Sequence, residues 1–218
     1  MFARRKKSWK SRAYDRLALR AFVHLTELPP SPQLHELIAE LHEASGDYPM
    51  AAEEWEKAYG LSHEDPEIGE HLAAALVQAS DYRPAGQLLE TILRRQPRSA
   101  EVNYLLGFSL LNLQKPAQAI PYFRKAVDLD SGMLTAQRDW GRAYLQIGQS
   151  ASAIPHLKAA LSLDDDGSLH YQLARAYVAT GQRRLAARML QVYQRMHQAD
   201  ERQAEMLKRQ VRVTPPSP

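Results

Sequence analysis

Small residues recur at two fixed places along residues 32–200, five times over, with a spacing of about 34 residues. The first series is Ala39, Ala73, Gly107, Gly141 and Ala174, and the second is Ala51, Ala85, Ala119, Ala153 and Ala186. All steps within each series have the same length except the last, which is shorter by one position. A repeat of this length is typical of helical hairpins that stack into a solenoid, because one hairpin cannot bury both of its faces alone.

The unit at residues 134–166 shows how each repeat is expected to fold. Its first predicted helix has an apolar stripe of Trp140, Gly141 and Tyr144, and its second has a stripe of Ala153, Leu157 and Ala160. Gly148 lies between the stripes, where a helix end favours a residue that can adopt positive φ. Because Gly141 and Ala153 are small, the two helix backbones can approach closely.

These marks resemble the tetratricopeptide repeat, whose signature is W-x2-L-G-x2-Y followed by A-x3-F. The stretch from Gly141 to Tyr144 matches the G-x2-Y part, and Ala119 with Phe123 matches A-x3-F. The first aromatic position departs from the signature, since it holds His35, Gly69, Asn103, Gln137 and His170 and never Trp. The resemblance spans about three quarters of the chain. It implies an all-α, right-handed α-solenoid of about five helix-turn-helix repeats with capping helices.

The segments on either side of the repeats are expected to form caps and tails. We expect a basic flexible head at 1–10, an N-terminal capping helix at 11–30, five repeats at 32–65, 66–99, 100–133, 134–166 and 167–200, a C-terminal capping helix at 201–212 and a disordered tail at 213–218. Ala18, Phe22 and Leu25, followed by Pro29-Pro30, resemble the second helix of a repeat that lacks its first. They fit either a capping helix or the rear part of a longer repeat protein.

Charge is strongly segregated along the chain, although the net formal charge is only +3. Residues 1–20 carry a net +7, residues 27–70 carry −11 and residues 71–218 carry +7. Such asymmetry sets local potentials, and therefore the kind of partner that each part of the chain attracts.

The resemblance also implies that the first helices of successive repeats line a concave groove. The residues that would point into it are Glu36, Glu40, Glu43, Glu67, Glu70, Tyr104, Phe108, Leu111, Asn112, Arg138, Arg142, Tyr171 and Arg175. The groove would then change from acidic through aromatic to basic. Tyr104 and Phe108 could hold an apolar anchor of a partner, and Arg138 with Arg142 could grip a carboxylate. The alternative is that these are ordinary solvated or packed helix residues.

Binding of a protein or peptide partner in the groove is the function that the resemblance implies. Glu36, Glu40 and His71 stand among the places where the family's clamp for chaperone tails needs Lys and Asn, so we do not expect a chaperone tail. One alternative is head-to-tail self-association, in which the acidic repeats of one copy meet the basic repeats of another. Another is a nucleic-acid or membrane adaptor that uses the basic head. Because the head has few aromatic residues and precedes an acidic segment, we do not expect either of these two partners.

The sequence carries no catalytic signature, and we expect no enzyme, no cofactor and no metal. There is no cysteine, so disulfides and thiolate metal sites are excluded. His35 and His42 lack a His-Glu-x-x-His arrangement and fall at packed positions of the repeat. No Gly-rich phosphate loop or nucleophile elbow occurs. No apolar run reaches the ~18 residues of a membrane span, and no apolar signal region follows the basic start, which favours the cytoplasm.

Overall fold

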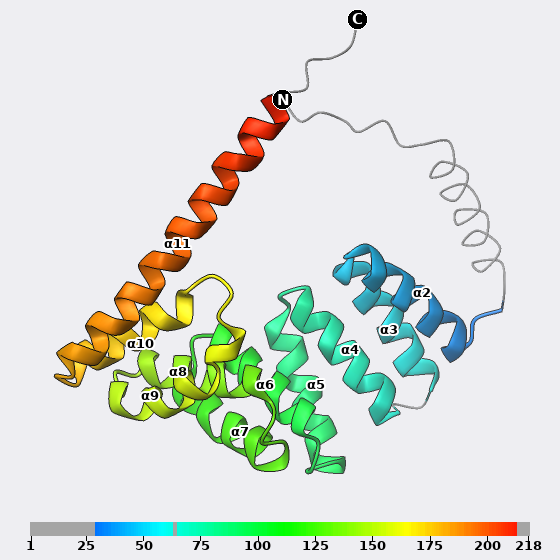
Figure 1. Cartoon of the computed structure of the whole chain (residues 1–218). Helices are drawn as coiled ribbons and strands as arrows, with labels where there is room; N and C mark the ends of the chain where they lie inside the picture. Colours follow the sequence, from blue (N-terminus) through cyan, green and yellow to red (C-terminus); the bar gives the residue numbers. More distant parts are fainter. Residues whose placement is uncertain (1–28, 63–64, 213–218) are drawn as a thin grey trace, which may run out of the picture. The chain divides into compact units, whose positions relative to one another are not determined.

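The computed structural model describes residues 29–62 and 65–212, with side chains described as far as residue 198. These residues form ten α-helices, one short 3-10 helix and no strand (Figure 1). The predicted all-α class, built from helix-turn-helix repeats, is confirmed. The predicted head, the predicted N-terminal capping helix up to residue 28 and the predicted tail lie outside the described residues. The chain divides into two compact units, Met1–Pro97 and Arg98–Pro218.

The first unit contains four helices in its described part. They are α2 (Pro32–Ser45), α3 (Tyr48–Leu61), α4 (Pro66–Gln78) and α5 (Tyr82–Arg95). Side-chain oxygens of Ser31 and Asp65 accept N–H groups from the first turns of α2 and α4. Both of these helices begin with a proline, whose missing N–H costs little there. Each helix of the unit packs against the next, around a core that contains the almost completely buried Trp55.

The second unit continues the same alternation of helices. Its elements are α6 (Ala100–Asn112), α7 (Pro116–Leu129), α8 (Leu134–Gln146), α9 (Ser150–Ala159), the 3-10 helix Leu161–Leu163, α10 (Ser168–Ala179) and α11 (Arg183–Arg212). Consecutive α-helices pack against each other, and Phe123, Leu157 and Leu173 are fully buried between them. The Asp164 carboxylate accepts the backbone N–H groups of Leu169 and His170, which fixes the start of α10.

The turn between the two helices has the same backbone geometry in all five repeats. Its left-handed position holds Gly46, Ser80, Gln114, Gly148 and Gly181, with φ values between 60° and 78°. Glycine adopts this conformation without a steric penalty, whereas the Cβ atoms of Ser80 and Gln114 crowd the backbone. The repeat therefore keeps its turn even in the two units where the local sequence opposes it.

Two glycines bring helix pairs of the second unit into close contact. A Cβ atom on Gly141 would lie 2.7 Å from Leu157 Cγ and 3.2 Å from the Leu157 backbone nitrogen. A Cβ atom on Gly107 would lie 2.9 Å from two ring carbons of Phe123. Favourable carbon contacts begin at about 3.5 Å, so even one methyl group is too large at either place. This close approach is the physical reason for the first series of small residues.

The last helix differs from the sequence prediction, because α11 is continuous from Arg183 to Arg212. We expected the second helix of the fifth repeat to end near residue 200 and a separate capping helix to follow at 201–212. No Gly or Pro interrupts residues 183–212, and the stretch is rich in Ala, Gln, Glu, Met and Arg, which favour helix. A change to polar composition alone does not end a helix.

Candidate partner-binding surfaces

Four carboxylates surround a hollow in the first unit, which we call the acidic hollow. Its volume is about 470 Å³, and its lining residues are Pro32, Gln33, Glu36, Glu40, Trp55, Ser62, Asp65, Glu67, Ile68 and His71. Three predicted groove residues, Glu36, Glu40 and Glu67, are therefore brought together. Within the part of the chain that the structure describes, none of the four carboxylates forms an ion pair with Lys or Arg.

An aromatic pair lies in the wall of the acidic hollow. The rings of Trp55 and His71 stack with their centroids 4.8 Å apart and their planes inclined by 12°. His71 is exposed, whereas Trp55 is almost completely buried. Trp55 therefore backs the His71 ring and holds it at the surface of the hollow.

The other two predicted acidic groove residues lie outside this lining. Glu43 accepts a hydrogen bond of 2.9 Å from Trp55 Nε1, so it fixes the indole ring from α2. Glu70 is half-buried on α4 and does not line the hollow. Glu43 thus contributes to the hollow indirectly, because it positions the Trp55 ring on which His71 stacks.

A buried carboxylate joins α2 to α3. Glu54 on α3 contacts His35 Nδ1 at 2.6 Å and accepts a hydrogen bond of 2.7 Å from Lys57 Nζ. Burial alone would raise the pKa of Glu54, but the hydrogen bonds from Lys57 and His35 outweigh it and lower the pKa. His35 is half-buried, which agrees with the packed role predicted for it.

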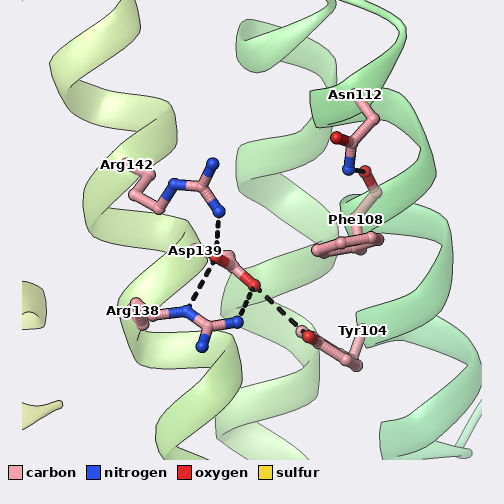
Figure 2. Close-up of polar contacts among 6 residues, drawn as sticks. All are labelled: Tyr104, Phe108, Asn112, Arg138, Asp139 and Arg142. Carbon is pink, nitrogen blue, oxygen red and sulfur yellow. Dashed lines mark hydrogen bonds and ion pairs between the residues drawn. The ribbon is translucent and has the colours of Figure 1, made fainter. Parts of the chain in front are cut away.

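In the second unit, a fully buried carboxylate gathers the predicted basic residues of α8 (Figure 2). Arg138 donates from Nε to Asp139 Oδ1 over 3.1 Å and from Nη2 to Oδ2 over 3.0 Å. Arg142 donates from Nη1 to Oδ1 over 2.9 Å, and the Tyr104 hydroxyl on α6 donates to Oδ2 over 3.3 Å. We call these four residues the Asp139 cluster. The two arginines do grip a carboxylate, but it belongs to their own chain.

The geometry of the Asp139 cluster determines its charge. Burial raises the pKa of Tyr104 to about 12, and the charge of Asp139 adds to the effect, so the hydroxyl remains a donor. The hydrogen bond to Asp139 raises the pKa of Arg138 against the opposing effect of burial. The side chains of Arg138 and Arg142 remain 32% and 40% exposed. Two guanidinium groups and one carboxylate leave a single net positive charge, which attracts an anion less than two free arginines would.

The predicted apolar anchor on α6 is only partly accessible. The rings of Tyr104 and Phe108 lie 6.0 Å apart at 45°, and both residues are half-buried. Asn112 donates from Nδ2 to the Phe108 backbone oxygen over 2.9 Å. Leu111 is only 2% exposed, which corrects its assignment to the groove. The cause is that α6 is buried on most of its circumference, so its register alone does not define an open face.

The two predicted groove residues of the fifth repeat, Tyr171 and Arg175, lie on an exposed strip of α10 together with Val178, which was not predicted. Tyr171, Arg175 and Val178 follow at intervals of four and three residues, so they share one helix face. Tyr171 is 44% and Val178 is 60% exposed. The Tyr171 ring contacts the ring of Tyr193 on α11, with the ring centroids 5.3 Å apart. We call these three residues the α10 strip.

Sequence reasoning missed the carboxylate at the centre of the Asp139 cluster. Asp139 directly follows Arg138 and precedes Arg142 by three residues, a spacing at which ion pairs form on a helix. That spacing was a usable signal for the pairing. Nothing in the spacing indicated that the carboxylate would be fully buried.

The described residues hold neither a metal site nor a membrane span. Between residues 29 and 198, apart from 63 and 64, no group of three or more His, Asp or Glu side chains is arranged to hold a metal ion. In the described ranges no helix combines the length and the apolar character needed to cross a bilayer.

Comparison with known proteins agrees with this architecture. Solved structures of a similar fold include a MamA fragment from Desulfovibrio magneticus RS-1, with 21% identity, coverage of 77% of this chain and 96% of that chain, and a TM-score of 0.69. A double mutant of MamA RS-1 has 20% identity, coverage of 78% of this chain and 96% of that chain, and a TM-score of 0.70. MamA MSR-1 has 24% identity, coverage of 79% of this chain and 98% of that chain, and a TM-score of 0.64. At these identities the likeness concerns the fold alone.

The sequence itself carries the family assignment. No curated protein matches the chain significantly. The tetratricopeptide repeat profile, however, matches residues 72–133 and 138–203, which together are more than half of the chain. With five helical hairpins among its described residues and its matched repeats, the chain belongs to the tetratricopeptide repeat family.

Proposed function

We propose that the chain is a non-catalytic scaffold that binds a basic segment of a protein partner in the acidic hollow. The observation that carries this proposal is the set of four hollow carboxylates, which have no Lys or Arg partner among the described residues. Carboxylates that share one hollow repel one another, and a cation that enters between them relieves this repulsion. The favoured occupant is therefore a Lys or Arg side chain.

The chemistry of the acidic hollow favours arginine over lysine. A guanidinium group can donate to two carboxylates at once, for example to Glu36 and Glu40, which lie one turn apart on α2. Its flat face can also lie against the exposed ring of His71. Lysine offers a point charge without this planar fit, so it should bind more weakly.

Calorimetric titration of the full chain with a synthetic peptide of alternating Arg and Ser tests the proposal. Changing Glu36→Gln together with Glu40→Gln should weaken binding by about tenfold, which corresponds to roughly 1.4 kcal/mol. A matched control is Glu53→Gln with Glu56→Gln, which removes the same charge from exposed positions of α3 outside the hollow. The control should change affinity by less than about threefold, since exposed charges outside the hollow are screened by solvent and salt.

Two outcomes of this titration would contradict the proposal. Equal losses in the two double variants would mean that net charge, and not the acidic hollow, attracts the peptide. An equal affinity for a peptide of alternating Glu and Ser would mean that charge does not select the partner.

Charge segregation favours self-association as a second candidate function. Residues 27–70 carry a net −11 and residues 71–218 carry +7. We propose that the α10 strip, which offers Arg175 between two exposed apolar groups, meets the acidic hollow of another copy. Light scattering should then give a mass that falls as salt rises, and Arg175→Glu should reduce that mass at low salt. A constant monomeric mass at every salt concentration would rule this candidate out.

A further inference from the structure

His71 differs in its charge chemistry from every other described residue that lines the acidic hollow. The four carboxylates of the lining are either negative or neutral, and the remaining lining side chains carry no charge. An imidazole, by contrast, ordinarily gains a positive charge between about pH 8 and about pH 5. The acidic hollow therefore contains a group of its own that can become a cation.

The His71 ring is held by its stack and not by an ion pair. It lies 4.8 Å from the Trp55 ring at an angle of 12°, and Glu43 fixes the indole through Trp55 Nε1. In the described ranges, three other histidines approach a carboxylate within 4.0 Å, whereas His71 makes no such contact. A positive charge on His71 would thus act on the hollow as a whole, because it is not bound to one carboxylate.

The charged groups that share the hollow with His71 come from α2 and from the start of α4. They are Glu36 and Glu40 on α2, Asp65 at the N-cap of α4 and Glu67 in its first turn. α3 and α5, the helices of this unit that pack against α4, contribute no charged residue to the lining. A protonated His71 would therefore be an internal cation among carboxylates that have no Lys or Arg partner in the described part of the chain.

We propose that His71 makes partner binding in the acidic hollow sensitive to pH, an inference that rests on the proposed function. Neutral His71 leaves the four carboxylates to the guanidinium group of the partner and offers it a ring face. Protonated His71 supplies the positive charge itself and repels a second cation. The charged ring stays in the hollow, because a cation is attracted to the face of an indole ring. A basic segment is therefore bound at about pH 7.5 and released as the pH falls toward about 5.5.

Calorimetric titration of the full chain at pH 7.5 and pH 5.5 tests this inference. The probe is the peptide of alternating Arg and Ser, acetylated at its N-terminus so that its own charge stays constant. An ordinary imidazole is about 10% protonated at the first pH and about 90% at the second. If the protonated form excludes the partner, the affinity of the parent should fall by about tenfold between the two values.

Three variants separate the charge of His71 from its ring. His71→Phe keeps an aromatic ring for the stack but cannot be protonated, so its affinity should change by less than about twofold between the two pH values. His71→Arg carries a permanent positive charge, so it should bind at pH 7.5 about as weakly as the parent binds at pH 5.5. His63→Gln, a change at another histidine of the first unit, should keep the pH dependence of the parent.

The outcomes distinguish this inference from the proposed function. Equal losses of affinity at pH 5.5 in the parent and in His71→Phe would overturn the inference, while binding at pH 7.5 would leave the proposed function intact. A parent affinity that is the same at both pH values would overturn it as well. If the peptide does not bind at pH 7.5, the proposed function fails, and the inference fails with it.

Discussion

Gly141→Ala places one methyl group where α8 and α9 approach each other. The new Cβ would lie 2.7 Å from Leu157 Cγ, 2.8 Å from Cδ2 and 3.2 Å from the Leu157 backbone nitrogen. Leu157 is fully buried, so its side chain has little room to rotate away. The backbone nitrogen can move only if α9 moves with it.

Two opposing effects set the size of the change. Overpacking of a tight core costs about 1–3 kcal/mol. Alanine in a helix interior gains about 1 kcal/mol over glycine. The expected net loss for Gly141→Ala is therefore about 0–2 kcal/mol, since the propensity gain hides part of the packing cost. Gly141→Leu adds three further carbons at the same place, so its loss should be larger, about 3 kcal/mol or more.

A matched variant separates the two effects. Gly60→Ala makes the same change in α3, where nothing lies within 4 Å of the new Cβ. Thermal denaturation followed by circular dichroism should place Gly141→Ala below Gly60→Ala by roughly 2–8 °C. If Gly141→Ala melts at or above Gly60→Ala, the close approach of α8 and α9 is not what requires a small residue there.

Three further perturbations follow from the turns and the buried carboxylates. Gln114→Gly should raise the free energy of unfolding by about 0.5–1 kcal/mol, because Gln114 has a φ of 60° that glycine adopts without crowding. Urea denaturation measures this change, and an unchanged midpoint would contradict the prediction. Asp139→Asn should lower stability by about 1–3 kcal/mol, because Arg138 and Arg142 lose a charged acceptor, while the exposed Asp128→Asn serves as control in the same urea assay. The folded pKa of Glu54 lies below its ordinary value of 4.5, so its carboxylate stabilises the fold above this pH and loses that effect as the pH falls through the folded pKa. Melting curves between about pH 5 and pH 3 should therefore show a larger fall in Tm for the parent than for Glu54→Gln, and parallel curves contradict this.

The fold was predictable because the regular spacing of small residues is enough to identify the helical hairpins. Ala39 and its equivalents must be small wherever two helices cross closely, so their regular recurrence reveals the hairpins without any knowledge of contacts. The end of α11 was not predictable in the same way. A helix continues until a residue or a contact stops it, and residues 183–212 contain neither Gly nor Pro.

The sequence indicated the charge of each candidate surface, but not whether its charged side chains are free to contact a partner. Glu36, Glu40 and Glu67 line one hollow, and their charge and repeat position are both visible in sequence. Arg138 and Arg142 do lie together, but the carboxylate that they bind is Asp139 of their own helix. The full burial of Asp139 depends on the helices that pack against α8. Spacing gives the side of a helix on which a residue lies, and only packing decides whether that side is open.

The uninterrupted last helix gives the second unit a mechanical property. With 30 residues, α11 is about 45 Å long, whereas the 12 residues of α10 span about 18 Å. More than half of α11 therefore has no length of α10 beside it, as Figure 1 shows. Such a rod acts as a lever arm: a tilt of about 10° at the last hairpin displaces its far end by about 8 Å. A small rearrangement at the α10 strip would thus be converted into a movement large enough for a distance probe near residue 212 to detect.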